Sequence, residues 1–487
     1  MFLLLCSNFL WAQRPTQGGL FSFSSDDEIH FYDLEFIRVH YSSIGSNSVL
    51  ADDDDENGIP DYVERVAQTT LEAWQFFEDT GFRSPVREDV LFSQFDNLGG
   101  SDSFDVYLVD FGGNSDGHLG IDTCGDGFCS GYLVIENDFS GYGYPSIEIA
   151  TRVLVSHELF HAVQNAYRVS FSPWMSEGMA TWAEHLFDDT LMDYYYLCGA
   201  YLEEPTRSIN STPAGAISSF SYGTALFFDF VAIHLGVDFW IAVLDELSVE
   251  PYNNDENADE MNVVISLAES IISEENTGYI DFLDLWNTFG IWNLGTGWRA
   301  GNVIGIFENG TFESYEYADS LEEVAYEKMS EDGFLEDTHR FYPLSSSYFW
   351  FHHQGGSLPF YTSDFRNETP LYFALISVSA EHDGLFGDVQ GVVDIWESQG
   401  FDEQNWELEE GDYWLVGLVG AQSEESQKTT FCIGHQCKKE NYLPEDIDEV
   451  TDTNGDTKKQ GGCSTLSYDV SSIGIYLLLI FGVRRRS

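Results

Sequence analysis

Basic residues are scarce in this chain. The 487 residues include only 20 Lys and Arg against 83 Asp and Glu, which gives a formal net charge of −63. Such a surface repels the phosphates of nucleic acids and the headgroups of anionic lipids, so we expect neither as a partner. The acidic excess instead predicts a strongly solvated exterior. With 43% hydrophobic and 16% aromatic residues, the chain is long and apolar enough for two or three domains with a large core.

Long hydrophobic runs are also missing, and short ones lie at the two ends. Residues 1–12 resemble a secretory signal peptide without its basic n-region, a gap that a start codon assigned too late would explain, and we expect cleavage after Ala12. The apolar run 473–483 is about half of the roughly 20 residues that a membrane-spanning helix needs. Between Cys463 and three final arginines, it resembles the C-terminal sorting tails of bacterial surface proteins. A plain tail anchor is the alternative.

Cysteine is uncommon, with seven residues in the chain. Cys124 and Cys129 bracket a tight turn, and Cys432 and Cys437 bracket another four residues. In an exported chain this spacing predicts two short-loop disulfides, with weak Cys-x4-Cys metal sites as the alternative. Cys198 has no evident partner, and we expect it to be buried.

The pattern of apolar residues changes twice along the remaining chain. Alternating apolar residues predict strands at 36–41, 105–110 and 132–136, and apolar stripes predict helices at 60–77 and 147–168. From about 180 to 335 the pattern is mostly helical. After Phe341, short strand candidates at 348–351, 371–377, 392–396 and 412–419 alternate with Gly- and Ser-rich turns, which indicates a β-sandwich.

Histidine is scarce too, yet two of the 12 stand four residues apart in His157-Glu158-Leu159-Phe160-His161. Residues at this spacing lie on one face of a helix, so both imidazoles can bind one ion. Glu158 lies one position round, where it can activate a metal-bound water without being a ligand. Fifteen residues separate His161 from Glu177, which could return on a second helix as the third ligand and leave the fourth position open to water.

These motifs carry a resemblance to known enzymes. The His-Glu-x-x-His pattern followed by Trp174-x-x-Glu177-Gly178-x-Ala180 resembles the gluzincin clan of metallopeptidases, although the spacing is shorter than in its aminopeptidase N group. Over roughly residues 36–300 the chain also resembles uncharacterised secreted bacterial metallopeptidases. The resemblance implies that Glu177 is the third zinc ligand, with Glu184 and His185 as alternatives or supporting partners. It also implies that Tyr222 donates to the oxyanion, with an ordinary core tyrosine as the alternative. His185 and His234 are weaker candidates for this role.

A second ion is indicated upstream. Residues 53–64 match the twelve-residue EF-hand loop, with Gly58 at the sharp turn and Pro60 opening the following helix. The alternative is an acidic, solvated turn. The calcium ligands that we expect are Asp53, Asp55, Asn57, the Ile59 carbonyl, Asp61 and Glu64.

Together these features predict an α+β, zincin-like metallopeptidase domain, in which a mixed sheet and an active-site helix precede a mostly helical half, followed by a C-terminal β-sandwich. We expect a monomeric zinc endopeptidase with Zn²⁺ and Ca²⁺ as cofactors, acting on proteins or peptides at the bacterial cell surface (outer membrane), with membrane contact only through the tail or its replacement anchor. The alternatives are a surface binding protein with a structural zinc centre and a zinc hydrolase of non-peptide amides. The expected segments are a signal peptide (1–12), a polar leader (13–30), the metallopeptidase domain (31–335), the sandwich (336–440), an acidic linker (441–462) and the sorting tail (463–487).

Overall fold

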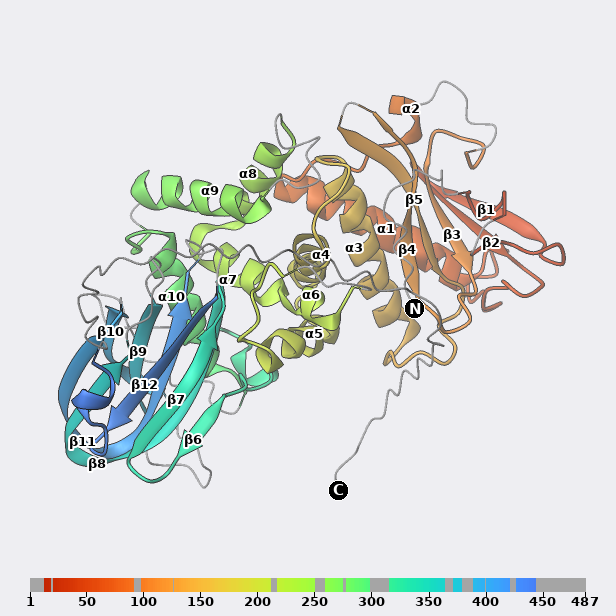
Figure 1. Cartoon of the computed structure of the whole chain (residues 1–487). Coiled ribbons are helices and arrows are strands. Elements are labelled where there is room, and N and C mark those ends of the chain that lie inside the picture. The colour runs from red at the N-terminus through yellow and green to blue at the C-terminus, as the bar shows by residue number, and fades with distance from the viewer. Residues whose placement is uncertain are drawn as a thin grey trace, which may run out of the picture.

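The computed structural model places two sheets at opposite ends of the molecule with a layer of helices between them (Figure 1). Both sheets and the helices agree with the expected mixture of helix and strand. The predicted signal peptide, the sorting tail and most of the acidic linker lie outside the described residues. The structure describes residues 13–18, 21–91, 98–125, 127–211, 217–249, 259–274, 277–297, 315–363, 371–378, 389–398, 400–420 and 426–443.

The N-terminal sheet has five strands in the order β1-β2-β3-β5-β4. The inner pairs β2–β3 and β3–β5 are parallel, whereas β1 and β4 run antiparallel to their neighbours. Strand β4 is therefore a sheet edge, and it was not among the expected strands. The strands are β1 (Ile29–Leu34), β2 (Ile37–Ser42), β3 (Phe104–Val109), β4 (Gly117–Gly125) and β5 (Phe128–Glu136).

Two long helices cover one face of this sheet. Helix α1 (Asp61–Thr80) follows Pro60 as expected, and it ends at Gly81, which has the positive φ of 108° common at helix ends. Helix α3 (Ile147–Asn165) begins where the Ser146 hydroxyl accepts a hydrogen bond from the Ile149 N–H. It contacts α1, β4 and β5 and is buried on most sides, so the sheet and its neighbours fix its position.

The middle layer is helical, as the sequence predicts. It contains α4 (Pro173–Phe187), α5 (Met192–Glu203), α6 (Ser219–Gly223), α7 (Ala225–Leu235), α8 (Val237–Leu247), α9 (Glu260–Glu274) and α10 (Phe282–Trp292), while the four-residue α2 (Glu88–Leu91) lies beside the first sheet. Within the described ranges no single helix has the length and hydropathy of a membrane span. The pair Ser219–Leu235 and Val237–Leu247 passes that test together, but it is bent by 112°.

The C-terminal sheet has seven strands in the order β10-β9-β11-β8-β12-β7, with β6 also paired to β8. One face has its own aromatic core around Phe349 and Phe373, and the other face joins the core of the helical layer through Tyr348 and Trp414. The strands are β6 (Lys328–Ser330), β7 (Phe334–Phe341), β8 (Ser345–Thr362), β9 (Leu371–Val378), β10 (Val389–Ser398), β11 (Asp402–Val419) and β12 (Gln427–Gly434).

Two expectations need correction in detail. Strands β8 and β11 each run for 18 residues, longer than the short strands expected, because Gly355 and Gly356 continue β8 with positive φ where the sequence indicated a turn. The segment 13–30 is not a free polar leader, since Arg14 is only 1% exposed. Both predicted disulfides, Cys124–Cys129 and Cys432–Cys437, are present, and Cys198 is buried.

Candidate metal centre

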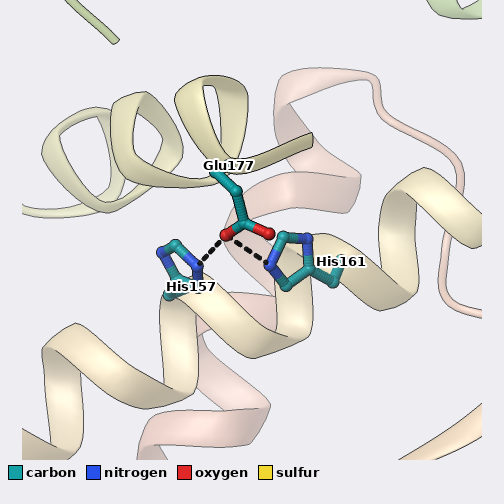
Figure 2. A group of neighbouring side chains, drawn as sticks. All are labelled: His157, His161 and Glu177. Carbon is teal, nitrogen blue, oxygen red and sulfur yellow. Dashed lines mark ion pairs between the residues drawn. The ribbon is translucent and has the colours of Figure 1, made fainter. Parts of the chain in front are cut away.

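His157 and His161 lie on one face of α3, and Glu177 of α4 reaches between them (Figure 2). The Glu177 Oε2 atom is 3.4 Å from His157 Nε2 and 3.5 Å from His161 Nε2. One ligand atom of each residue lies within 4.8 Å of the other two. The structure thus brings together the three residues that the sequence predicts as zinc ligands.

The spacing of these atoms fits zinc. A tetrahedral ion with ligand distances of about 2.0–2.2 Å holds its ligands about 3.4 Å apart. A direct charge-assisted hydrogen bond between an imidazole and a carboxylate is usually shorter, about 2.7–2.9 Å. The observed separations match the first geometry, and two imidazoles with one carboxylate form a donor set that zinc prefers.

Buried acceptors hold both imidazoles with their Nε2 atoms toward Glu177. His157 Nδ1 lies 2.6 Å from Glu184 Oε1, and His161 Nδ1 lies 2.8 Å from Gln164 Oε1. Since an oxygen acceptor places the proton on Nδ1, each Nε2 is left free to bind a metal. Burial raises the pKa of Glu184 to about 7, against the opposing effect of His157.

Glu177 is placed by contacts on both sides of α4. The helix begins at Pro173, and the Glu260 carboxylate of α9 accepts a hydrogen bond from the Ser172 N–H just before it. At Gly178 an added Cβ would lie 2.0 Å from the Thr224 hydroxyl, so only glycine permits this approach of the α6–α7 junction. Burial favours the neutral form of Glu177, but the neighbouring His161 and His157 hold its pKa well below the usual range.

Glu158 faces the start of the edge strand β4. A Cβ added at Gly117 would lie 3.2 Å from the Glu158 Cγ atom, so strand and side chain are in close contact. Glu158 is 7% exposed, and burial raises its pKa, although the two histidines oppose the shift. A carboxylate with a raised pKa is a better proton acceptor near neutral pH than an exposed one.

Tyr222 also lies at this site. Its ring stacks on the His157 imidazole with centroids 5.9 Å apart, and its hydroxyl is near enough to Glu177 for that carboxylate to raise its pKa. Burial and the charges of Glu177 and Glu158 raise its pKa, so the phenol keeps the proton that an oxyanion donor needs.

The other histidine candidates lie in different surroundings. His185 stacks on Tyr194 at 4.2 Å and contacts Tyr317, and the group of potential ligands found at this site does not include it. His234 accepts or donates a 2.6 Å hydrogen bond with the Tyr279 hydroxyl. Both have the aromatic environment of structural histidines.

Four residues at or near the site were missed by the sequence reasoning. Gln164 could have been found, because it lies three positions after His161 on the same helix. Its amide also donates to the Ser176 carbonyl at 3.0 Å, which ties α3 to the first turn of α4. The other three are Asp116, its hydrogen-bond donor Tyr144, and His118, whose pKa is lowered by burial and by the neighbouring His161. Asp116 and His118 lie at the start of β4, a strand that no alternating pattern predicts, and Tyr144 lies just before α3.

The predicted calcium loop forms a compact acidic turn. Carboxylate oxygens of Asp53, Asp55 and Asp61 lie within 4.8 Å of one another. The Asn57 amide is 2.9 Å from Glu64 Oε1 and 3.0 Å from Asp55 Oδ2, and Gly58 has the expected positive φ of 90°. The side chains of five of the six predicted ligand residues therefore lie close together, and Ile59 lies in the same turn. This set of oxygens suits a hard cation such as calcium.

Comparisons with known proteins add no identity. No protein-family model and no curated protein matches the sequence. Solved structures similar to part of the chain include the pre-peptidase C-terminal domain of a Bacillus anthracis collagenase, with 8% identity over 23% of this chain and 93% of that chain and a TM-score of 0.16. The Aeromonas hydrophila lysozyme inhibitor PliG has 8% identity over 23% of this chain and 98% of that chain, with a TM-score of 0.16. The copper-binding surface protein CorA of Methylomicrobium album BG8 has 7% identity over 23% of this chain and 98% of that chain, with a TM-score of 0.18. Such low TM-scores carry no argument, so the gluzincin resemblance stays a prediction.

Proposed function

We propose that this protein is a zinc-dependent peptidase whose metal ligands are His157, His161 and Glu177. The observation that carries the proposal is the spacing of 3.4 and 3.5 Å between the Glu177 oxygen and the two imidazole nitrogens. Two further features support the proposal. The ligands are largely buried, and the Nδ1 atoms of both histidines are bound to neighbouring side chains, so the site is preorganised for a metal. The zincin-like fold of the N-terminal part and the sandwich form of the C-terminal sheet belong to the same proposal.

The residues around the site suit amide hydrolysis. Zinc in this position would act as a Lewis acid and lower the pKa of a bound water toward neutrality. Glu158 would accept the proton of the attacking water and return it to the leaving amine. The Tyr222 hydroxyl would donate a hydrogen bond to the oxygen on which negative charge develops.

The neighbouring sheet edge supports a peptide substrate. Strand β4 pairs only with β5 among the described strands, and its first residues lie against Glu158. An extended peptide could add to such an edge by main-chain hydrogen bonds, which would hold its carbonyl groups beside the catalytic carboxylate. Two disulfides support action outside the cell, where oxidising conditions keep them formed.

The proposal predicts stoichiometric zinc and zinc-dependent proteolysis. Zinc content is measured by elemental mass spectrometry, and activity on casein and on a peptide library, before and after treatment with a zinc-selective chelator. We expect chelation to abolish cleavage and zinc alone to restore it. Tight zinc binding without any cleavage would instead indicate a structural centre in a binding protein. Cleavage of non-peptide amides alone would indicate the other hydrolase class.

We propose in addition that residues 53–64 bind calcium. At a calcium concentration a hundred times Kd, binding contributes about 2.7 kcal/mol, which raises Tm by about 5–10 °C. Asp53→Asn should remove this rise, because it deletes one of the converging carboxylates. The matched control is Asp54→Asn, an equal charge change at an exposed position of the same loop. A calcium response that survives Asp53→Asn as well as it survives Asp54→Asn would contradict the proposal.

A further inference from the structure

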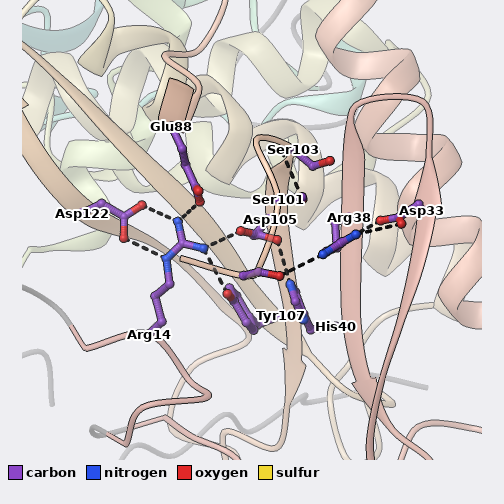
Figure 3. A network of polar contacts seen from close by, with 11 residues as sticks. Arg14, Asp33, Arg38, His40, Glu88, Ser101, Ser103, Asp105, Tyr107 and Asp122 are labelled. Carbon is purple, nitrogen blue, oxygen red and sulfur yellow. Dashed lines mark hydrogen bonds and ion pairs between the residues drawn. The ribbon is translucent and has the colours of Figure 1, made fainter. Parts of the chain in front are cut away.

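Arg14 is one of the most deeply buried charged side chains in the described structure, with 1% of its surface exposed. It enters from residues 13–18 and meets carboxylates from three separate elements (Figure 3). Its Nε and Nη2 atoms donate to the two oxygens of Asp122 on β4 at 2.9 and 2.6 Å. The other contacts of the guanidinium are with Glu88 of α2, Asp105 of β3 and, at 3.1 Å, the Tyr107 hydroxyl.

This surrounding fits a guanidinium specifically. The bidentate pair with Asp122 needs two parallel N–H groups, which a lysine cannot supply. The Tyr132 ring also lies under the guanidinium, 4.9 Å from its central carbon. Carboxylates, a phenol and an aromatic face thus surround one planar cation.

The charges in this cluster nearly balance with Arg14 in place. Burial raises the pKa of Glu88 to about 9, although the Arg14 charge opposes the shift, and this favours the neutral form of Glu88. Asp105 also binds the His40 imidazole at 2.7 Å. Without Arg14, the buried carboxylate of Asp122 would lose its bidentate partner, and Asp105 would keep its contact with His40 but lose the arginine. Removing one partner of a buried charge pair strongly destabilises a fold.

Two further aromatic residues of the N-terminal segment pack on the same sheet face. Phe21 and Phe23 contact a buried aromatic and aliphatic group formed by Tyr107, Val109, Phe111, Tyr132 and Val134. Phe21 also lies 6.1 Å from the His118 ring, measured between centroids. Both Asp122 and His118 belong to β4, so the segment touches the edge strand at two places.

We propose that Glu88, Asp105, Asp122 and Tyr107 form a guanidinium-binding site that the chain fills with its own Arg14. Residues 13–18 are then a permanent strap of the folded protein that holds edge strand β4 to the sheet, and not a removable pro-segment. This inference does not depend on zinc or on peptidase activity, because it concerns stability and site occupancy.

Chemical rescue tests the proposal on the full chain. We expect Arg14→Ala to lower Tm by about 10 °C, and guanidinium or methylguanidinium chloride at low millimolar concentration to restore part of that loss. At this concentration guanidinium is far below the molar range in which it denatures proteins. Sodium chloride and urea at equal concentration serve as solute controls. Arg87→Ala, which removes a partly exposed arginine paired with Asp89, is the matched variant and should show no rescue.

Several results would overturn the proposal. One is a Tm of Arg14→Ala within about 2 °C of the wild type. Another is a guanidinium-induced change in Tm that is equal for Arg14→Ala and Arg87→Ala. If Arg14→Ala yields no folded protein, its refolding yield with and without guanidinium replaces Tm, and an unchanged yield counts against the site. N-terminal sequencing of the exported, folded wild type needs no variant. A chain that begins after Arg14 would rule out a permanent strap.

Discussion

Glu158→Gln should slow peptide hydrolysis about a thousandfold while the protein keeps its fold and its zinc. The substitution preserves the shape of a side chain that is 7% exposed and is not among the three potential ligands, so neither core packing nor metal affinity should change much. It removes the carboxylate that would accept the proton of the attacking water. General acid–base groups contribute about 10²–10⁴-fold. We therefore expect kcat to fall by about three orders of magnitude, measured on the peptide library under saturating zinc.

A matched variant separates catalysis from local disturbance. Glu148→Gln makes the same change on the same helix, where the carboxylate is largely exposed and forms only a 3.6 Å ion pair with Arg65. It should leave kcat within about twofold of the wild type, because such surface pairs contribute little. Full activity of Glu158→Gln with zinc bound would refute the assignment of Glu158 as the base.

The local part of the candidate site could be predicted from the sequence. Helical geometry alone places His157, Glu158 and His161 on adjacent parts of one surface. The return of Glu177 could also be expected, because the intervening residues suffice for a turn and a second helix. Periodicity likewise located α1, α3 and the inner strands β2 and β3 to within a few residues. In each case the information lies within one short segment.

The remaining features depend on contacts between distant segments. Strand β4 carries three glycines, a histidine and a disulfide-bonded cysteine, a composition with no alternating pattern, and its position beside α3 follows from sheet order. Arg14 is 74, 91 and 108 positions from the carboxylates that surround it. Its segment is polar in sequence, so only the folded sheet shows that the arginine is buried. Gln164 is the exception, since its i, i+3 relation to His161 was visible.

The sequence offers Glu177, Glu184 and His185 as candidates for the third ligand. In the structure, Glu177 and Glu184 lie on different sides of the His157 ring. Glu177 faces the Nε2 atoms of both histidines, whereas Glu184 accepts from His157 Nδ1 on the other side of the ring. Glu177→Gln and Glu184→Gln are matched variants, because they make the same substitution at two positions of α4 that lie two helical turns apart. Both side chains are at least 92% buried, so packing costs should be similar.

We expect the two variants to differ in zinc affinity, measured by competition with a chromogenic chelator. Loss of a residue that supports a ligand costs about 10- to 100-fold in affinity, which is the effect expected for Glu184→Gln. Glu177→Gln should weaken binding well beyond that range, because a neutral amide replaces the charged ligand and only two imidazoles remain. The spectrum of the cobalt-substituted protein provides a second measurement, since loss of a ligand changes the coordination geometry and loss of a supporting partner does not. If Glu184→Gln is the more damaging change by both measurements, the metal lies on the Nδ1 side of His157, and the ligand set proposed for this site is wrong.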